Sequence, residues 1–213
     1  MDNSLLNIKL VIFSVISNRL KVFLRGNVLP HGLLIQNKSL DKGAEEIFRS
    51  CLKMPFKNLY FEQLYTFSSY EKKGISVVYY FLVPEHKLYS KDNDWIDINI
   101  ELLTGSGLKG AKGLTLISKY DKEIILYALQ RLRWKIEYTN AVYSFLPDEF
   151  TFSQLQSVYE AILGKTLDKR NFRKKMLSLG ILEDTGHIKK LGKSRPAEMF
   201  SFKKRELTFV EIL

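Results

Sequence analysis

The chain has 213 residues, of which 46% are hydrophobic, 13% aromatic and 26% charged, and its formal net charge is +10. This composition is typical of a globular protein with one large or two small domains, and it excludes a wholly disordered chain. The single cysteine, Cys51, excludes an intramolecular disulfide framework and a four-cysteine zinc site, so we expect a reducing compartment.

The first apolar run, Leu10–Ile16, is too short to span a bilayer and lacks the flanking features of a signal peptide. We therefore expect a cytoplasmic protein that has no membrane partner.

The first 89 residues are rich in strand patterns. Ser17-Asn18 separates the first two runs and is typical of a hairpin turn. One stretch, Ser39–Leu52, has helical spacing instead, with Ser39 as a candidate N-cap. The expected strands are Leu5–Ile16, Arg19–Leu24, Asn58–Phe67 and Gly74–Pro84. Strands that flank a helix in this order predict a mixed α/β domain.

A glycine-rich stretch at residues 104–113 contains Gly105-x-Gly107-x-x-Gly110, which has the spacing of a dinucleotide-binding fingerprint. No clear strand precedes it, and apolar Ile124 and Ile125 stand about twenty positions on, where an acidic residue belongs. We interpret it as a flexible loop.

A helix is predicted over 121–137, capped by Asp121 and with an apolar stripe on one side. We expect Arg131, Arg133 and Lys135 on its other side. A domain boundary is predicted near residues 140–147, where Leu146-Pro147 interrupts the pattern.

The positive charge is concentrated near the C-terminus. Residues 165–205 hold 13 basic and only four acidic residues, which favours a polyanionic partner such as nucleic acid over a solvated surface.

The same region has the pattern of a helix-turn-helix. Thr151-x-x-Gln154 is a capping box that opens one helix, and Gly164 ends it. Asp168 caps a second helix that runs to Leu179, and Gly180 follows it as a left-handed cap.

The second helix has one apolar face and a basic remainder, as a DNA-recognition helix does. After it, strands at Ile181–Asp184 and Glu198–Phe202 enclose a basic loop, His187–Pro196, and predict a winged helix. A solvated helix and an ordinary surface loop are the alternative interpretations. The candidate DNA contacts are Lys169, Arg170, Asn171, Arg173 and Lys174 on the helix, and Lys189, Lys190, Lys193, Ser194 and Arg195 in the wing.

These motifs resemble a known family. FTFSQLQSVYEAILGKTLDKRNFRKKMLSLG (Phe150–Gly180), followed by Arg195-Pro196-Ala197, is similar to the winged helix of the Nudix-related transcriptional regulators of the NrtR type. LQRLRWKIEYT (Leu129–Thr139) resembles that family's interdomain helix. YFEQLYTF (Tyr60–Phe67) and VVYYFLVP (Val77–Pro84) resemble two strands of its Nudix-like domain.

The resemblance implies a bacterial regulator with an α/β/α Nudix-like domain at residues 1–142, including the interdomain helix 121–137, and a winged helix at 143–213. In this family the first domain senses a small molecule, and the second binds a palindromic operator as part of a homodimer. Typical members repress genes of NAD biosynthesis and respond to ADP-ribose or a related nucleotide, whereas other branches regulate sugar use.

The resemblance also allows the Nudix box to be placed on the sequence. Counting from Gly32, the first glutamate of the box falls on Lys38, and its arginine falls on Glu46. The paired metal-binding glutamates fall on Ser50 and Cys51, which cannot replace hard oxygen ligands for Mg²⁺. We therefore predict no Nudix hydrolysis, no metal and no cofactor.

Arg25 is the candidate effector-binding residue, although its pattern favours the interpretation as a plain surface arginine. His31, His86 and His187 have no metal-ligand spacing. Two alternatives remain open: an atypical Nudix hydrolase that uses Glu45 and Glu46, and a constitutive DNA-binding protein whose Nudix-like domain is only a scaffold.

Overall fold

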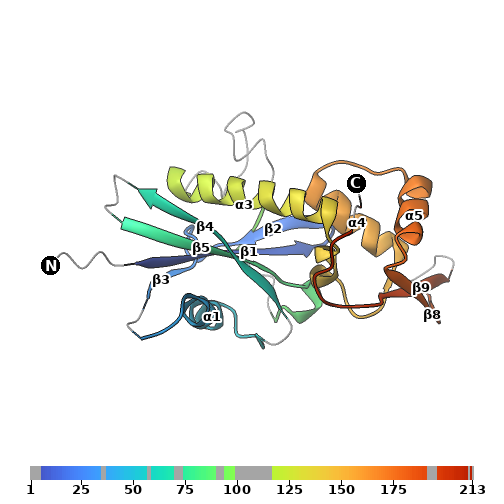
Figure 1. Ribbon diagram of the computed structural model, residues 1–213, viewed down its shortest axis with the longest axis horizontal. Coiled ribbons are helices and arrows are strands. Elements are labelled where there is room, and N and C mark those ends of the chain that lie inside the picture. The colour runs from blue at the N-terminus through green and yellow to red at the C-terminus, as the bar shows by residue number, and fades with distance from the viewer. Residues whose placement is uncertain are drawn as a thin grey trace.

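The computed structural model describes residues 6–34, 37–56, 59–69, 74–89, 94–98, 117–190, 196–210 and 212. An α/β/α sandwich lies at one end of these residues, and two helices with a small sheet lie at the other (Figure 1). The glycine-rich stretch 104–113 and the wing residues Lys193, Ser194 and Arg195 lie outside the described residues.

The described part of the sandwich has a mixed sheet with the strand order β4-β5-β1-β2-β6, and β3 pairs with β1 beyond the end of β2. β1 and β5 are parallel, whereas the other neighbours are antiparallel. Ser17 and Asn18 form the predicted turn, with φ of 51° and 62°. The strands are β1 (Asn7–Ile16), β2 (Arg19–Phe23), β3 (His31–Leu33), β4 (Tyr60–Ser69), β5 (Gly74–Leu82) and β6 (Trp95–Asp97).

The central strand β1 is buried on both faces, because successive side chains point to opposite sides of a sheet. Leu10 and Ile12 pack toward α1 (Leu40–Cys51), whereas Val11 and Phe13 pack toward α3 (Lys119–Tyr138). Figure 1 shows α3 and α1 on opposite faces of the sheet. The predicted mixed α/β domain is thereby confirmed.

The predicted caps of these two helices differ in outcome. Ser39 caps α1 as expected, accepting a hydrogen bond from the Lys42 amide. The prediction that Asp121 caps the interdomain helix is wrong, because Ser118 caps α3 and the helix begins two residues earlier. Asp121 instead faces the sheet from the first turn, where it is buried and forms an ion pair of 2.6 Å with Lys9.

Lys135 is also misplaced by the sequence pattern, which puts it on the outer side of α3. Its side chain is buried and donates hydrogen bonds to Glu62 at 2.6 Å and to the Tyr60 hydroxyl at 3.0 Å. Tyr60 and Tyr80 both donate to the same carboxylate. A polar network therefore joins the C-terminal half of α3 to β4 and β5.

This network makes stability depend on pH. Burial tends to raise the pKa of Glu62, but hydrogen bonds from Lys135, Tyr80 and Tyr60 outweigh it and hold the pKa below the usual 4.5. The stabilisation by the Glu62 carboxylate is therefore complete above about pH 4.5 and is lost as the pH falls through the lower folded-state value. We expect Glu62→Gln to unfold in urea with less dependence on pH below about 5 than the parent chain. An unchanged pH profile would contradict this assignment.

The C-terminal part forms the predicted winged helix. Helices α4 (Phe152–Leu163) and α5 (Lys169–Ser178) lie between the first and second strands, in chain order, of a small sheet with the strand order β7-β9-β8. Gly164 and Gly180 end the helices with φ of 70° and 64°. The strands are β7 (Phe150–Thr151), β8 (Leu182–Lys189) and β9 (Ala197–Phe202). β8 is longer than predicted because Ile188 and Lys189 resume pairing with β9 after an irregularity.

The capping box of α4 gives a direct prediction for stability. Thr151 accepts a hydrogen bond from the Gln154 amide, and the Gln154 side chain accepts one from the Thr151 amide. We expect Thr151→Ala to lower the free energy of unfolding by about 1–2 kcal/mol, since a lost cap leaves an amide without its partner. Thermal or urea unfolding measures the loss. Ser153→Ala, one residue into the same helix, is the control and should change stability little.

The segment around the predicted boundary is packed rather than linker-like. Ala141–Phe145 forms a 3₁₀ turn, η3, whose Ala141 and Val142 are fully buried. Apolar side chains of α4 share one continuous core with those of β2 and α3, and the Arg133 guanidinium donates to the carbonyl of Ile162. The winged helix and the sandwich are therefore joined through a common apolar interface.

The residues after the wing return to α3, which the sequence pattern does not indicate. Phe209 forms a β-bridge with Thr139 and stacks on Tyr138, and the Ile212 amide donates to the Glu137 carbonyl. Arg205 donates to the carbonyls of residues 143, 146 and 147. No helix in the described ranges is long and apolar enough to cross a bilayer.

Candidate nucleic-acid interface

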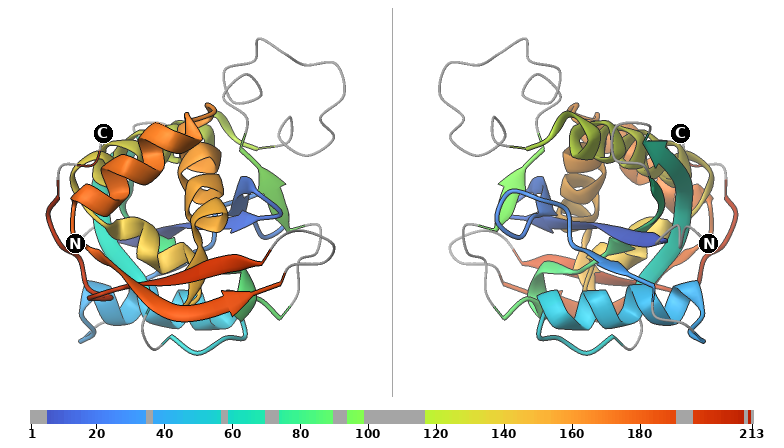
Figure 2. Two further views of the ribbon diagram at one scale, coloured as in Figure 1. Left: turned by 90° about the vertical axis from the view of Figure 1, so that its right-hand side faces the viewer. Right: turned by 90° about the vertical axis from the view of Figure 1, so that its left-hand side faces the viewer.

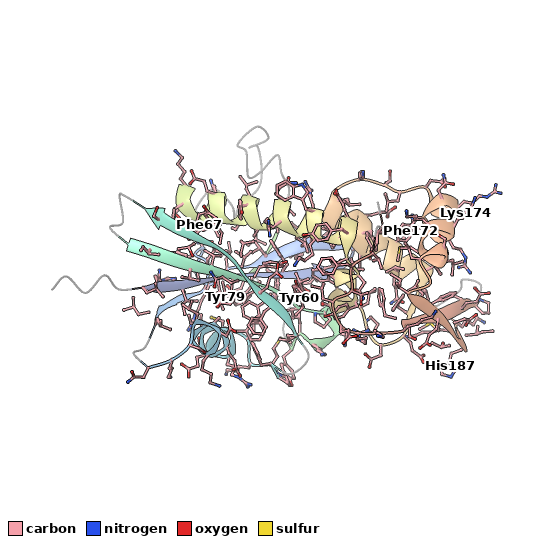
Figure 3. The ribbon with its side chains drawn as sticks, viewed as in Figure 1. Tyr60, Phe67, Tyr79, Phe172, Lys174 and His187 are labelled. Carbon is pink, nitrogen blue, oxygen red and sulfur yellow. The ribbon has the colours of Figure 1, made fainter. Side chains whose placement is uncertain are left out.

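Helix α5 presents its basic side chains on the outer end of the molecule. Lys169, Arg170, Asn171 and Lys174 are exposed. Figure 3 shows Lys174 pointing away from the protein, whereas Phe172 lies on the inner side of the helix. Within the described residues, the side chains of Lys169, Arg170 and Lys174 have no ion-pair or hydrogen-bond partner. Their cationic groups are therefore free to bind an anion.

The inner face of α5 is held by apolar contacts. Phe172 and Met176 are buried, and the Phe172 ring packs edge-on against Tyr159 of α4 with ring centroids 5.2 Å apart. Asp168 accepts a hydrogen bond from the Asn171 amide at 2.8 Å, which confirms the predicted cap. This anchorage fixes which side of the helix carries the free cations.

Arg173 differs from its neighbours on the helix. Its side chain is only half-exposed, at 42%, and it forms an ion pair with Glu198 on β9. Its guanidinium also lies over two aromatic rings. The helical pattern alone places this residue with the free basic groups, because it cannot show which side chains arrive from α4 and β9.

The wing lies at the same end of the molecule as α5 (Figure 2). Lys189 and Lys190 are exposed at the end of β8. His187, also on β8, contacts the Glu149 carboxylate at 2.9 Å, and among the described residues it belongs to no group of three side chains that could hold a metal ion. The structure thus brings the basic residues of α5 together with the root of the wing.

The positions of the Nudix box lie on β3, α1 and the loop between them. Lys38 and Glu46, which stand where the box has a glutamate and an arginine, form an ion pair of 2.7 Å with the charges exchanged. Glu45 is engaged by Arg49 and Lys42, whose hydrogen bonds lower the pKa of its carboxyl. The described residues contain no cluster of three histidine, cysteine, aspartate or glutamate side chains that could hold a metal ion.

The described surface includes two hollows of interest. One, of about 240 Å³, adjoins the C-terminal end of α1, and its lining includes Phe23, Cys51, Lys53, Tyr89 and Asp94. The other, of about 560 Å³, lies between the turn η1 (Glu85–Lys87) and the residues that join the winged helix to α3, and its lining includes His86, Lys87, Tyr143, Asp148 and Arg205.

The candidate effector residue Arg25 lines neither hollow. It is exposed beside a tight turn of Gly26 and Asn27, with φ of 60° and 65°, and it forms a β-bridge with Val28. Cys51 and Lys53, at the C-terminal end of α1, line the first hollow, although the sequence alone predicted neither as an effector contact.

Comparison with known proteins adds to this geometry. Residues 142–202 match the family model described as the NrtR DNA-binding winged helix domain. The chain is 29% identical to the ADPR responsive transcriptional repressor NtrR of Acinetobacter baylyi, in an alignment that covers 96% of this chain and 84% of that protein.

Solved structures agree in fold. The NrtR of Shewanella oneidensis, crystallised with a 27mer DNA, superposes with a TM-score of 0.70 at 23% identity and 93% coverage of both chains. A MutT/nudix family protein of Enterococcus faecalis gives a TM-score of 0.69 at 20% identity, covering 95% of this chain and 89% of that one.

The fold is therefore a Nudix-like α/β/α domain followed by a winged helix-turn-helix domain. The match of the winged helix, the order of the two parts and the curated relative together confirm the resemblance to the Nudix-related transcriptional regulators of the NrtR type.

Proposed function

We propose that the protein is a cytoplasmic, DNA-binding transcriptional regulator, in keeping with the repressor named among its relatives. The observation that carries this proposal is the set of unpaired cations on α5, within a segment that matches the NrtR DNA-binding winged helix domain. Free basic side chains on an anchored helix are suited to phosphates and to base edges in the major groove.

The proposed DNA contacts are those of the exposed helix and wing. Lys169, Arg170, Asn171 and Lys174 would meet the major groove and the adjacent phosphates. The wing residues Lys190, Lys193, Ser194 and Arg195 would contact phosphates or the minor groove. In this proposal residues 1–142 form the sensing and dimerisation domain, residues 143–213 bind DNA, and two copies bind a palindromic operator.

We propose that the Nudix-like domain binds a small effector, either a nucleotide such as ADP-ribose or a sugar. A relative that covers most of this chain is described as ADPR responsive. The hollow at the end of α1 supports the proposal, because Tyr89 and Phe23 offer aromatic surface and Lys53 offers a cation. Arg25 remains a second candidate effector contact, outside that hollow.

The effector would act by binding alone, without being hydrolysed. Nudix hydrolysis needs carboxylates that hold Mg²⁺ against a pyrophosphate, and the corresponding positions carry Ser50 and Cys51. Glu45 and Glu46 are engaged in ion pairs with neighbouring basic side chains. We expect no cleavage of ADP-ribose or NADH in the presence of Mg²⁺. Cleavage that is lost in Glu46→Gln would establish the alternative of an atypical hydrolase.

The shared core constrains how a signal could reach DNA. The winged helix packs directly on the sheet domain, so we expect each protomer to move largely as one body. Effector binding would then shift the population between two arrangements of the protomers and change the spacing of the two recognition helices, so that they no longer match the half-sites.

Selection of genomic DNA fragments by the full-length protein tests the proposal. We expect recovery of fragments that share a palindromic site, and a gel shift of that duplex that is reversed by the correct effector. Thermal shift against ADP-ribose, NAD and common sugars identifies the effector through stabilisation. Site-specific binding with no stabilisation by any of these compounds would favour a constitutive DNA-binding protein with a scaffold domain.

A further inference from the structure

The Arg173 side chain bridges three elements of the winged helix. From α5, its Nη2 donates to Glu198 Oε2 of β9 at 2.7 Å. Its guanidinium carbon lies 4.4 Å from the ring centroid of Phe152, the first residue of α4, and 5.4 Å from that of Phe200 on β9. The two rings themselves pack edge to face at 4.7 Å. One side chain therefore touches both helices of the helix-turn-helix motif and the wing.

The chemistry of this contact requires an arginine. A planar guanidinium can stack on an aromatic face and donate in its own plane to a carboxylate at the same time. A lysine ammonium has the same charge but neither the plane nor the fork of donors. An exposed ion pair alone is weak, so the two rings are an essential part of the contact.

Glu198 stands at the root of the wing. It is the second residue of β9, where Ile188 of β8 pairs with it, and β9 in turn pairs with β7. The ion pair holds this residue to α5. It therefore sets the orientation of the β8–β9 hairpin relative to the recognition helix.

We propose that Arg173 and Glu198 form a clamp that fixes the angle between the recognition helix and the wing. Arg173 is then a positioning residue, and its guanidinium is not a contact to bases or phosphates. The inference rests on the proposed DNA-binding function. The two interpretations predict opposite effects of removing Glu198. If only charge mattered, loss of an acid from a DNA-binding face would strengthen DNA binding. If Glu198 is part of a clamp, its loss weakens DNA binding.

The test compares Arg173→Ala, Arg173→Lys, Glu198→Ala and the double variant Arg173→Ala/Glu198→Ala on the duplex that the parent chain selects. We expect each single variant to bind about tenfold more weakly, and the double variant to bind no more weakly than Arg173→Ala, since the two residues act as one unit. The slope of log K against log salt should stay unchanged in all of them. Lys174→Ala, the matched control, should reduce that slope by about 0.9, as a lost phosphate contact does.

A direct DNA contact by Arg173 predicts the opposite pattern. Tighter binding by Glu198→Ala, near-parent affinity of Arg173→Lys and a slope reduced by about 0.9 in Arg173→Ala would overturn the clamp. Melting temperatures of all variants show whether each one folds, and Arg173→Lys keeps the test usable if the alanine variant does not.

Hydrogen exchange separates this inference from the proposed function. We expect the amides of β9 to exchange faster in Arg173→Lys than in the parent chain or in Lys174→Ala, with or without DNA. If the parent chain selects no duplex, the DNA-binding function fails and exchange still tests the clamp. Equal exchange rates of the β9 amides in Arg173→Lys and in Lys174→Ala would contradict the proposed clamp.

Discussion

Replacing Asp121 with alanine should lower the free energy of unfolding by about 3–5 kcal/mol, because the change leaves the Lys9 ammonium buried without its counter-ion. The side chains of Lys9 and Asp121 are 6% and 2% exposed, and their charged atoms lie 2.6 Å apart. The second carboxylate oxygen of Asp121 also accepts a hydrogen bond of 3.4 Å from the Leu29 amide. Urea unfolding followed by circular dichroism measures the loss.

Two control variants separate the effect of the unpaired buried charge from other effects of the substitution. Lys9→Met/Asp121→Ala removes both partners and should recover most of the lost stability, since no buried charge remains. Ser118→Ala removes only the cap of α3 and should lower the free energy of unfolding by about 1 kcal/mol. A loss below about 1 kcal/mol in Asp121→Ala would show that water reaches Lys9, and that the pair contributes little.

The second large effect concerns DNA. Replacing Lys169, Arg170 and Lys174 together with alanine should weaken binding of the selected duplex on the order of a thousandfold at low salt. It should also reduce the salt slope by nearly 3, because each lost phosphate contact accounts for about 0.9. Fluorescence anisotropy at several salt concentrations provides both quantities.

A control variant with the same change in net charge tests whether the effect is specific to the α5 surface. Arg19, Lys42 and Arg49 are exposed cations of the sheet domain, and replacing all three with alanine lowers the net charge by the same amount. We expect this control to keep most of the affinity and the full salt slope. Equal losses in the two triple variants would mean that overall charge, rather than the α5 surface, governs binding.

The elements with local signals were predictable from the sequence. The Ser17-Asn18 turn, the Thr151–Gln154 capping box and the glycines that end α4 and α5 depend on residues within a few positions of each other. The anchored face of α5 follows from helical periodicity in the same way. These signals were enough for the mixed α/β domain and for the helix-turn-helix.

The errors concern residues whose partners lie far along the chain. Lys9 is 112 positions from Asp121, and Glu62 is 73 positions from Lys135, so spacing within α3 could not reveal that either helix residue is buried. The contacts of Arg173 with rings from α4 and β9 could not be predicted for the same reason, whereas its assignment as a DNA contact stays a prediction. The two hollows could not be predicted from the sequence either, because their linings combine loops that only the folded chain brings together.

The exchanged ion pair between Lys38 and Glu46 couples these two positions of the box. Restoring the glutamate of the hydrolase motif at position 38 alone would set two carboxylates against each other, and restoring the arginine at position 46 alone would set two cations together. Each single step back is opposed by repulsion between like charges, in addition to the missing acids at Ser50 and Cys51. A match to the hydrolase motif at these positions would therefore need several coordinated changes rather than one substitution at a time.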